Sequence, residues 1–271
     1  MSGVVAHDPE YVAARRVLLD ALDALGVHRK AVVLVGAQAI YLRVGPGDMA
    51  VAPFTTDGDL ALNPNVLDDE PTLAEALRAA GFDLAVTPGT WSLTDVQIDL
   101  LVPSSLGGPG RRSARLGPHG TEVARKAKGL EAALVDHSAV RLASLEAKDV
   151  RTFDVAVAGL AALLVAKLHK IAEREATPER WAPKDGLDVL RILRGADFVQ
   201  IATTLTGLEK HPVAGAVTLE ARAYLRRLFA SRNAHGAALA VRASAGLEEA
   251  AAIAVSCEVL ALSLLAAWDR A

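Results

Sequence analysis

The chain has 271 residues, of which 52 % are hydrophobic and 23 % charged, so it is long and apolar enough to fold around a sizeable core. The formal net charge of −3 gives no general attraction to nucleic acid or to an anionic membrane. The single cysteine, Cys257, excludes an intrachain disulfide and a cysteine-rich zinc site.

Two segments bear on where the protein resides. The first residues, MSGVVAHDPEYVAARR, lack a basic stretch followed by an apolar run, so no secretory signal is predicted and a cytoplasmic location is expected. Residues 250–268 are nearly long enough to span a membrane, but Glu258 lies near their centre, where a charge is costly in lipid. We predict a packed terminal helix there and no membrane contact.

Hydrophobic spacing predicts a helix and a strand near the start of the chain. Apolar side chains recur at helical intervals over residues 9–25, and Gly26 ends this run. Residues 31–35, AVVLV, are rich in β-branched side chains and predict a buried strand. A glycine then opens a predicted helix at residues 36–43, and residues 45–54 predict a loop.

The next segments continue the α/β pattern. Residues 60–64, LALNP, predict a strand that ends at the Asn-Pro pair. Residues 71–82 predict a short helix with a glycine near its end. Residues 91–103 predict a strand in their second half, because apolar residues alternate there with Gln97 and Asp99.

The second half of the chain changes character. Residues 104–129 are rich in Gly, Ser and Arg and predict a loop, while residues 130–157 leave further strands open. From about residue 158 the pattern is helical. We therefore predict two domains, residues 1–155 and residues 156–271.

The hexapeptide TTDGDL, residues 55–60, allows two interpretations. In an extended chain Asp57 and Asp59 project to the same face, and Asp99 on a second strand could join them. Three such carboxylates suit divalent cations, and two Mg²⁺ ions about 3.5–4 Å apart can clamp the attacking and leaving oxygens of a phosphoryl displacement. Alternatively, Asp57-Gly58 is a hairpin turn and Asp99 an ordinary strand-end carboxylate.

The order of these segments resembles the nucleotidyltransferase superfamily that includes polymerase β. VGAQAIYLR at 35–43 resembles its glycine turn, TTDGDLAL at 55–62 its paired-carboxylate strand, and VQIDLL at 96–101 its third-carboxylate strand. AKLHKIAER at 166–174, followed by KDGLDVLRIL at 184–193, resembles the AbiEii-type nucleotidyltransferases. These are the toxins of abortive-infection, type IV toxin–antitoxin systems.

The resemblance implies roles for the charged residues. Asp57 and Asp59 would bind both Mg²⁺ ions, and Asp99 would hold the catalytic ion and help to activate an acceptor hydroxyl. Lys167 would reach the nucleotide phosphates. Asp188 would position Lys167 or the acceptor.

The resemblance extends over roughly residues 10–195, but the glycine turn departs from it. Gly36, Ala37 and Gln38 would bind the nucleotide through close backbone approach and the amides of the following helix. The superfamily usually has Gly-Gly or Gly-Ser at the turn, often followed by a hydroxyl, and an apolar residue where this chain has Gly58. The first two departures concern triphosphate binding, and the third removes no metal ligand.

Lys167 lies within the apolar stripe of its predicted helix, three residues after Leu164. A lysine there has to extend its ammonium to solvent or meet an anion. Both a structural and a phosphate-binding lysine therefore fit, and the resemblance favours the second. Lys170 and Arg174 follow on the same side and could extend a positive face.

Local pairing offers another interpretation of the late acidic residues. Lys184 and Arg191 lie at helical spacing from Asp188, as in many weak surface ion pairs. The resemblance alone gives Asp188 a catalytic role, and Asp185 is expected to start the helix or support the site. His169 is expected on the helix surface, and no histidine pair has zinc-binding spacing.

A local excess of positive charge follows the predicted third-carboxylate strand. It comprises Arg111, Arg112, Arg115, Arg125, Lys126 and Lys128, against Glu122 alone. These residues either grip an RNA backbone or form a solvated loop. A second, weaker patch contains Arg222, Arg226 and Arg227.

The sequence thus predicts an α/β (α+β) nucleotidyltransferase core with a short mixed sheet, followed by a helical domain. The expected activity is Mg²⁺-dependent transfer of a nucleoside monophosphate from an NTP to an acceptor hydroxyl. RNA, particularly the 3′ end of tRNA, is the acceptor that the resemblance implies, with a cognate antitoxin as partner. Two alternatives are a small-molecule transferase, such as an antibiotic-modifying enzyme, and an inactive nucleotidyltransferase fold used as a binding module.

Overall fold

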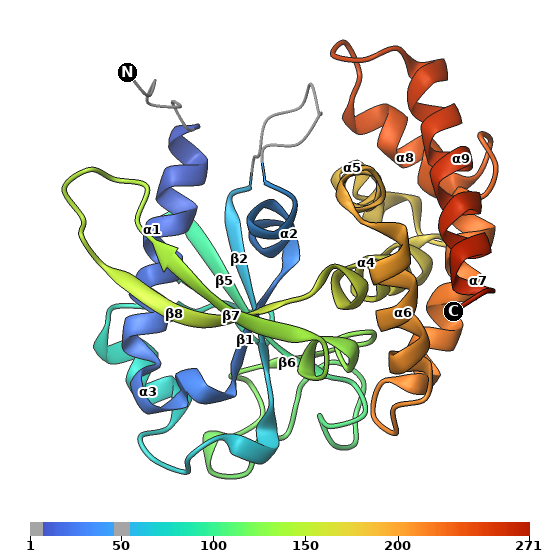
Figure 1. The fold of residues 1–271 in the computed structure, drawn as a ribbon. Coiled ribbons are helices and arrows are strands. Elements are labelled where there is room, and N and C mark those ends of the chain that lie inside the picture. Colours follow the sequence, from blue (N-terminus) through green and yellow to red (C-terminus); the bar gives the residue numbers. More distant parts are fainter. Residues whose placement is uncertain (1–7, 46–54) are drawn as a thin grey trace. The chain divides into compact units, whose positions relative to one another are not determined.

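The computed structural model describes residues 8–45 and 55–271 and has a mixed α/β fold (Figure 1). The described residues divide into two compact units. The sheet unit takes those within Met1–Gln38, Pro53–Ala127 and Ser138–Val157, and the helical unit takes those within Ala39–Ala52, Lys128–His137 and Ala158–Ala271. The predicted absence of a leader and the predicted loop at residues 46–54 lie outside the described residues.

Eight strands of the described chain form one mixed sheet, with β3-β4-β5-β2-β1-β8-β7 in order and β6 also paired to β5. Their bounds are β1 Val32–Val35, β2 Asp57–Leu62, β3 Asp83–Leu84, β4 Thr90–Leu93, β5 Val96–Pro103, β6 Arg125–Ala127, β7 His137–Ala143 and β8 Thr152–Ala158. Strand β1 is antiparallel to β2 and parallel to β8, and β2 is parallel to β5. The strand predicted from AVVLV is confirmed as β1, whose four residues are all buried.

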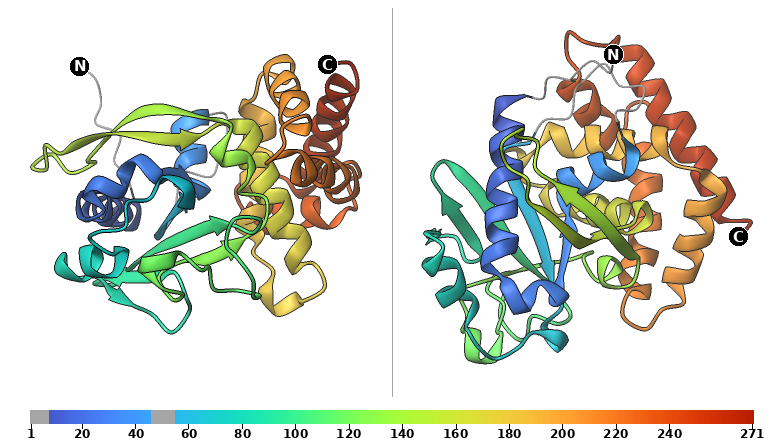
Figure 2. Two further views of the ribbon diagram at one scale, coloured as in Figure 1. Left: turned by 90° about the horizontal axis from the view of Figure 1, so that it is seen from below. Right: turned by 60° about the vertical axis from the view of Figure 1, so that its left-hand side comes forward.

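Helix α1, Pro9–Ala24, packs on the sheet against β2 and β5 (Figures 1 and 2). Asp8 caps it by accepting a hydrogen bond from the backbone N–H of Glu10. The helix predicted over residues 9–25 is therefore confirmed, and Gly26 follows it with a positive φ of 47°. The predicted short helix is α3, Leu73–Ala79, which begins with a capping box between Thr72 and Glu75.

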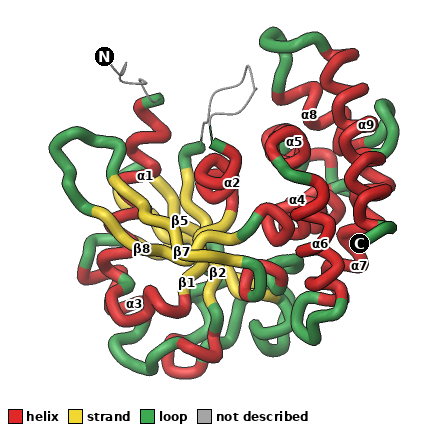
Figure 3. The backbone as a smooth tube through the Cα atoms, viewed as in Figure 1, coloured by secondary structure: helices red, strands yellow, loops and turns green. Residues whose placement is uncertain are grey.

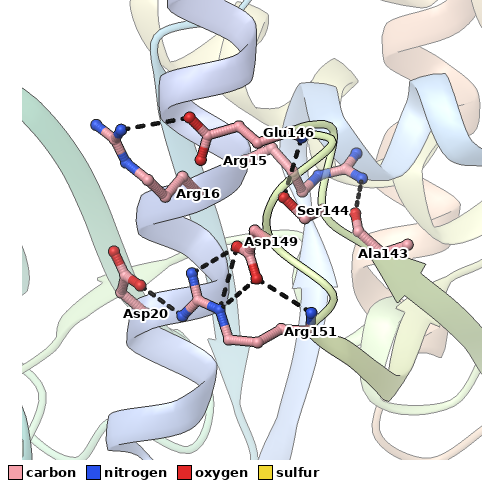
Figure 4. A network of polar contacts seen from close by, with 8 residues as sticks. All are labelled: Arg15, Arg16, Asp20, Ala143, Ser144, Glu146, Asp149 and Arg151. Atoms are coloured by element: carbon pink, nitrogen blue, oxygen red, sulfur yellow. Dashed lines mark hydrogen bonds and ion pairs between the residues drawn. The ribbon is translucent and has the colours of Figure 1, made fainter.

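Polar contacts join α1 to the end of β7 and to the segment between β7 and β8 (Figure 4). Arg151 pairs with Asp20 of α1 at 2.6 Å and with Asp149 at 2.8 Å. Arg15 is buried and donates a hydrogen bond to the carbonyl oxygen of Ala143. These contacts hold α1 in place along the sheet.

The helical unit contains most of α2 and six further helices (Figure 3). Their bounds are α2 Gly36–Val44, α4 Leu160–Arg174, α5 Pro183–Gly195, α6 Phe198–Glu209, α7 Gly215–Phe229, α8 His235–Ala243 and α9 Ala250–Trp268. Helix α4 packs against α5, α6 and α7, so it is covered on several sides.

Among residues 8–45 and 55–271, helix α9 is long and apolar enough to cross a membrane by length and composition alone. It packs against α5, α6, α7 and α8 and buries Ile253, Cys257, Leu264 and Trp268. Of its most apolar 18 residues, 28 % are buried. A packed terminal helix, as predicted from the sequence, is what these contacts show.

Two predictions about irregular segments need correction. Residues 104–129 are not all loop, because β6 and a short 3-10 helix, Gly117–His119, lie within them. The first half of residues 91–103 is also extended, since β4 reaches Leu93. Strands of three or four residues show too few alternations for a period of two to be recognised. The open segment 130–157 contains β7 and β8.

Candidate functional site

Asp57 and Asp59 lie on a strand, so the hairpin interpretation of Asp57-Gly58 is wrong. Along β2, Gly58 and Leu60 are buried. Asp57 and Asp59, which alternate with them, are half-buried. A side chain at Gly58 would meet Leu18 of α1, which shows that the buried face is the one packed on that helix. The two acids therefore project from the opposite face of the sheet.

Asp99 joins them on this face through the pairing of β2 with β5 (Figure 1). In this parallel pair the register partner of Asp59 is Asp99, and the partner of Gly58 is Ile98. Residues directly opposite each other on neighbouring strands project to the same side of a sheet. We call Asp57, Asp59 and Asp99 the carboxylate face.

Gly58 is explained by the same pairing. A Cβ atom there would lie 2.8 Å from Cδ1 of Ile98, which is too close for an unshifted contact. Where the superfamily that the sequence resembles usually has an apolar side chain, this chain has Gly58, and the side chain of Ile98 fills the space.

Gly36 begins α2 directly beside the carboxylate face. Its φ is +72°, and a Cβ atom would lie 2.0 Å from Oδ2 of Asp59. The side chain of Asp59 thus occupies the space that a larger residue would need. It also lies near the N-terminus of α2, where the helix dipole favours a negative charge.

The next two residues of α2 are buried. Gln38 accepts a hydrogen bond at Oε1 from Nε of Arg15, 2.9 Å away, and donates one from Nε2 to the backbone oxygen of Asp57. Both ends of its amide therefore hold the sheet unit together. Ala37 is 5 % exposed, so the contacts that α2 could offer a nucleotide come from the backbone.

Arg125 contacts both carboxylate oxygens of Asp99. Its Nη1 lies 2.5 Å from Oδ1 of Asp99, and its Nη2 donates to Oδ2 at 2.6 Å. Thr90 donates to the same Oδ1 at 2.7 Å. Burial lowers the pKa of Arg125, but Asp99, with smaller contributions from Asp59 and Asp57, outweighs it and raises the pKa above its ordinary value.

This contact was missed by sequence reasoning, which assigned Arg125 to a basic loop. Asp99 and Arg125 are 26 residues apart, and the pairing of β6 with β5 brings them together. Thr55, whose hydroxyl donates to Asp57, was missed as well. A hydroxyl two residues before an acid is a local signal that could have indicated this second contact.

The helical unit contains a buried cluster of Lys167, Asp185 and Asp188, which we call the lysine cluster. Nζ of Lys167 lies 2.7 Å from Oδ1 of Asp185 and 2.7 Å from Oδ2 of Asp188. The exposed fractions of the three side chains are 7 %, 5 % and 0 %. Lys167 thus meets two anions in place of solvent.

Burial opposes charge in this cluster, but the ion pairs prevail. Burial lowers the pKa of Lys167, and Asp185 and Asp188 raise it well above its ordinary value. Burial raises the pKa of Asp185, and Lys167, Lys170 and Arg174 lower it well below its usual range. Lys170 and Arg174 lie 3.1 Å and 3.4 Å from Asp185, so they compensate this acid as well as adding positive charge to the helix.

The prediction that His169 lies on the helix surface is wrong. It is 4 % exposed, and its Nε2 contacts the backbone oxygen of Val217 at 2.8 Å. Because α7 covers this side of α4, a position outside the main apolar stripe is also buried. Burial lowers the pKa of His169, which favours the neutral ring.

Half of the basic residues in the predicted loop contact other parts of the protein. Besides Arg125, Lys126 donates to the carbonyl oxygens of Gly108 and Gly110, and Lys128 pairs with Glu220 at 2.6 Å. The exposed remainder comprises Arg111, Arg112 and Arg115. In the second patch, Arg222 pairs with Glu209 and Asp269, and Arg227 pairs with Glu175.

No family model, curated protein or solved structure matches this chain.

The donor atoms of this face suit a hard divalent cation. Asp57 and Asp59 offer carboxylate oxygens on one face, and the absence of a side chain at Gly36 lets the carboxylate of Asp59 lie against the start of α2. Within residues 8–45 and 55–271, no group of three or more His, Cys, Asp or Glu side chains is arranged to hold a metal ion. A Mg²⁺ ion held by one or two carboxylates, with substrate phosphates completing its shell, fits the pair.

Proposed function

We propose that the protein is a Mg²⁺-dependent nucleotidyltransferase that moves a nucleoside monophosphate from an NTP to an acceptor hydroxyl and releases pyrophosphate. The observation that carries the proposal is the register of β2 and β5, which puts Asp57, Asp59 and Asp99 on one face beside Gly36. In the proposal the mixed sheet is a nucleotidyltransferase core.

Each residue of the carboxylate face has a part in this proposal. Asp57 and Asp59 hold Mg²⁺, whose charge, when bound, stabilises the negative charge of the reacting phosphates. Backbone amides at the start of α2 orient the triphosphate, because the N-terminus of a helix presents free N–H groups and a partial positive charge. Asp99 orients the acceptor hydroxyl and receives its proton.

The lysine cluster has a supporting part. The proposal assigns Lys167 to the nucleotide phosphates and Asp188 to the positioning of Lys167. The 2.7 Å ion pair between Lys167 and Asp188 supports the second assignment, since it fixes the ammonium group. Burial of both groups also keeps this pair from being screened by salt.

The acceptor and biological role rest on the resemblance to AbiEii-type toxins. We propose RNA, particularly the 3′ end of tRNA, as the acceptor, and Arg111, Arg112 and Arg115 as exposed contacts to its backbone. The protein would then act in the cytoplasm as the toxin of a toxin–antitoxin pair, with a cognate antitoxin.

A second candidate is an inactive nucleotidyltransferase fold that binds a ligand. Two observations favour it. Both oxygens of Asp99 are engaged by Arg125, and Gln38 replaces the hydroxyl expected after the glycine turn. Such a protein would still bind NTP with Mg²⁺ but would transfer nothing.

Incubation with each α-labelled NTP, Mg²⁺ and total tRNA tests the proposal. Label is expected in RNA with the wild type and is expected to disappear with Asp57→Asn and Asp59→Asn. Asp95→Asn is the matched control, because Asp95 is an exposed acid at the turn between β4 and β5. Undiminished transfer by both site variants would refute the metal assignment.

Absence of transfer in the wild type, with Mg²⁺-dependent NTP binding by calorimetry, would favour the second candidate.

A further inference from the structure

Asp99 forms an ion pair with a positively charged side chain of the same protein, Arg125. The guanidinium of Arg125 contacts both carboxylate oxygens, with separations of 2.5 Å and 2.6 Å. Such a two-point contact fixes the direction of the carboxylate as well as its charge. A divalent cation that approached these oxygens would meet a positive charge already in place.

The surrounding strands are built to hold this pair. Strand β6 runs parallel to β5, with Arg125 opposite Leu101. On the same edge of β5, Thr90 of β4 is the register partner of Asp99, donates to Oδ1, and lies 3.3 Å from Nη1 of Arg125. The pair is therefore fixed by three strands and by a shared hydroxyl.

Gly89 makes the approach of β6 possible. Its φ is +77°, and a Cβ atom there would lie 2.5 Å from the backbone nitrogen of Arg125 and 2.6 Å from the backbone oxygen of Leu100. Any larger residue would push the strand that carries Arg125 away from β5. The backbone of Arg125 is thus held beside β5 by strand pairing and by the absence of a side chain at Gly89.

We propose that Arg125 is the resident cation of the Asp99 position, so that this position takes no divalent ion while Arg125 is present. Removal of the guanidinium opens one additional divalent site, formed by oxygens of Asp99 and its register partner Asp59. This inference rests on the proposed function and deepens it, since it replaces the two-ion site that the resemblance implies by an ion at Asp57 and Asp59 together with Arg125.

Mn²⁺ binding to the full chain without nucleotide tests the inference, by titration followed with electron paramagnetic resonance. Arg125→Gln removes the charge and is expected to bind one more Mn²⁺ per chain than the wild type. Arg125→Lys keeps the charge and is expected to match the wild type. Adding Asp99→Asn to Arg125→Gln is expected to abolish the additional site. Equal Mn²⁺ stoichiometry in the wild type and Arg125→Gln would overturn the inference.

Thermal melting gives a second readout that does not depend on catalysis. In EDTA, Arg125→Gln is expected to melt below the wild type, because Asp99 has lost its counterion. Mn²⁺ is expected to raise the melting temperature of Arg125→Gln more than that of the wild type. An equal rise in both proteins would count against the inference.

The two proposals can fail separately. If the wild type and Arg125→Gln bind the same number of Mn²⁺ ions but the wild type labels RNA, the inference fails and the transferase proposal survives. If Arg125→Gln gains one Mn²⁺ ion but no NTP yields labelled RNA, the inference holds and the transferase proposal fails.

Discussion

The carboxylate face and the lysine cluster both combine acids with a base, but they differ in exposure and in charge balance. Asp99 and Arg125 expose 17 % and 27 % of their side chains, whereas Asp188 of the lysine cluster exposes none. The carboxylate face has three acids around Arg125. In the lysine cluster two acids meet Lys167, with Lys170 and Arg174 beside Asp185.

This difference suggests different uses for similar residues. A half-exposed face with excess negative charge can recruit a cation from solvent without first breaking the fold. In a buried cluster whose charges nearly balance, removal of one partner lowers the stability of the fold, because it leaves a buried charge without compensation. Substitutions at the carboxylate face should therefore weaken ligand binding with little loss of stability. Substitutions in the lysine cluster should lower the stability of the fold in addition to any binding by Lys167.

The largest effect is expected for Asp188→Ala in the lysine cluster. It leaves Lys167 buried with one acid fewer, and loss of one partner of a buried pair typically costs about 3–5 kcal/mol of unfolding free energy. Urea denaturation of the full chain measures this loss. Asp95→Ala, at an exposed acid, is expected to change the unfolding free energy by less than about 0.5 kcal/mol.

Replacing two members of the cluster together sharpens this test. Lys167→Met with Asp188→Leu is expected to recover part of the lost stability, because apolar side chains of similar size replace the charges. Asp185 keeps Lys170 and Arg174 as partners in that variant. A stability loss in Asp188→Ala no larger than in Asp95→Ala would show that burial does not separate the two regions.

A smaller effect on stability, with a clear effect on binding, is expected for Gly36→Ala at the carboxylate face. The left-handed backbone costs a non-glycine residue about 1–2 kcal/mol, and the new Cβ atom also displaces the carboxylate of Asp59. Mn²⁺ binding is expected to weaken by about tenfold or more, which corresponds to about 1.4 kcal/mol.

Gly117→Ala is the matched control for Gly36→Ala. Gly117 also has a positive φ, of +58°, but a Cβ atom there meets nothing within 4 Å. Its substitution tests backbone strain alone and is expected to leave Mn²⁺ binding unchanged. If both variants bind Mn²⁺ as the wild type does, Asp59 is not a ligand.

The residues of these two regions show how far the sequence leads. The spacing of Asp57 and Asp59 predicts a shared face once the segment is extended, but the choice between strand and turn depends on pairing with distant β5. The apolar stripe around Lys167 predicts a lysine that either extends its ammonium to solvent or meets an anion, and in the structure it meets Asp185 and Asp188.

Contacts between residues far apart in the chain could not be predicted where no local pattern indicates them. Arg125 lies in a three-residue strand within a Gly- and Arg-rich segment, so its composition indicates a loop and its pairing with Asp99 is invisible. His169 was misplaced because the number of helices that cover α4 is a tertiary property. Hydrophobic periodicity gives one buried stripe, and additional covering helices bury positions outside it.

The smallest effect is expected from pH, and it separates the lysine cluster from His169, its neighbour on α4. Burial holds the pKa of His169 below its ordinary value of 6.5, so below about pH 6.5 the unfolded chain binds more protons than the folded chain. His169 therefore makes the unfolding free energy fall as pH decreases through this range. Asp185 loses its contribution only as pH falls below its unfolded pKa of about 3.9, so Asp185 contributes about equally at pH 7 and pH 5.

Denaturation at pH 7.5 and pH 5.5 should accordingly show a smaller fall for His169→Gln than for the wild type. A glutamine amide can still donate to the backbone oxygen of Val217, so the contact is retained while the titration is removed. His137→Gln makes the same substitution at an exposed histidine and serves as the comparison. If His169→Gln loses as much stability as the wild type between these pH values, the ring is not held neutral by burial.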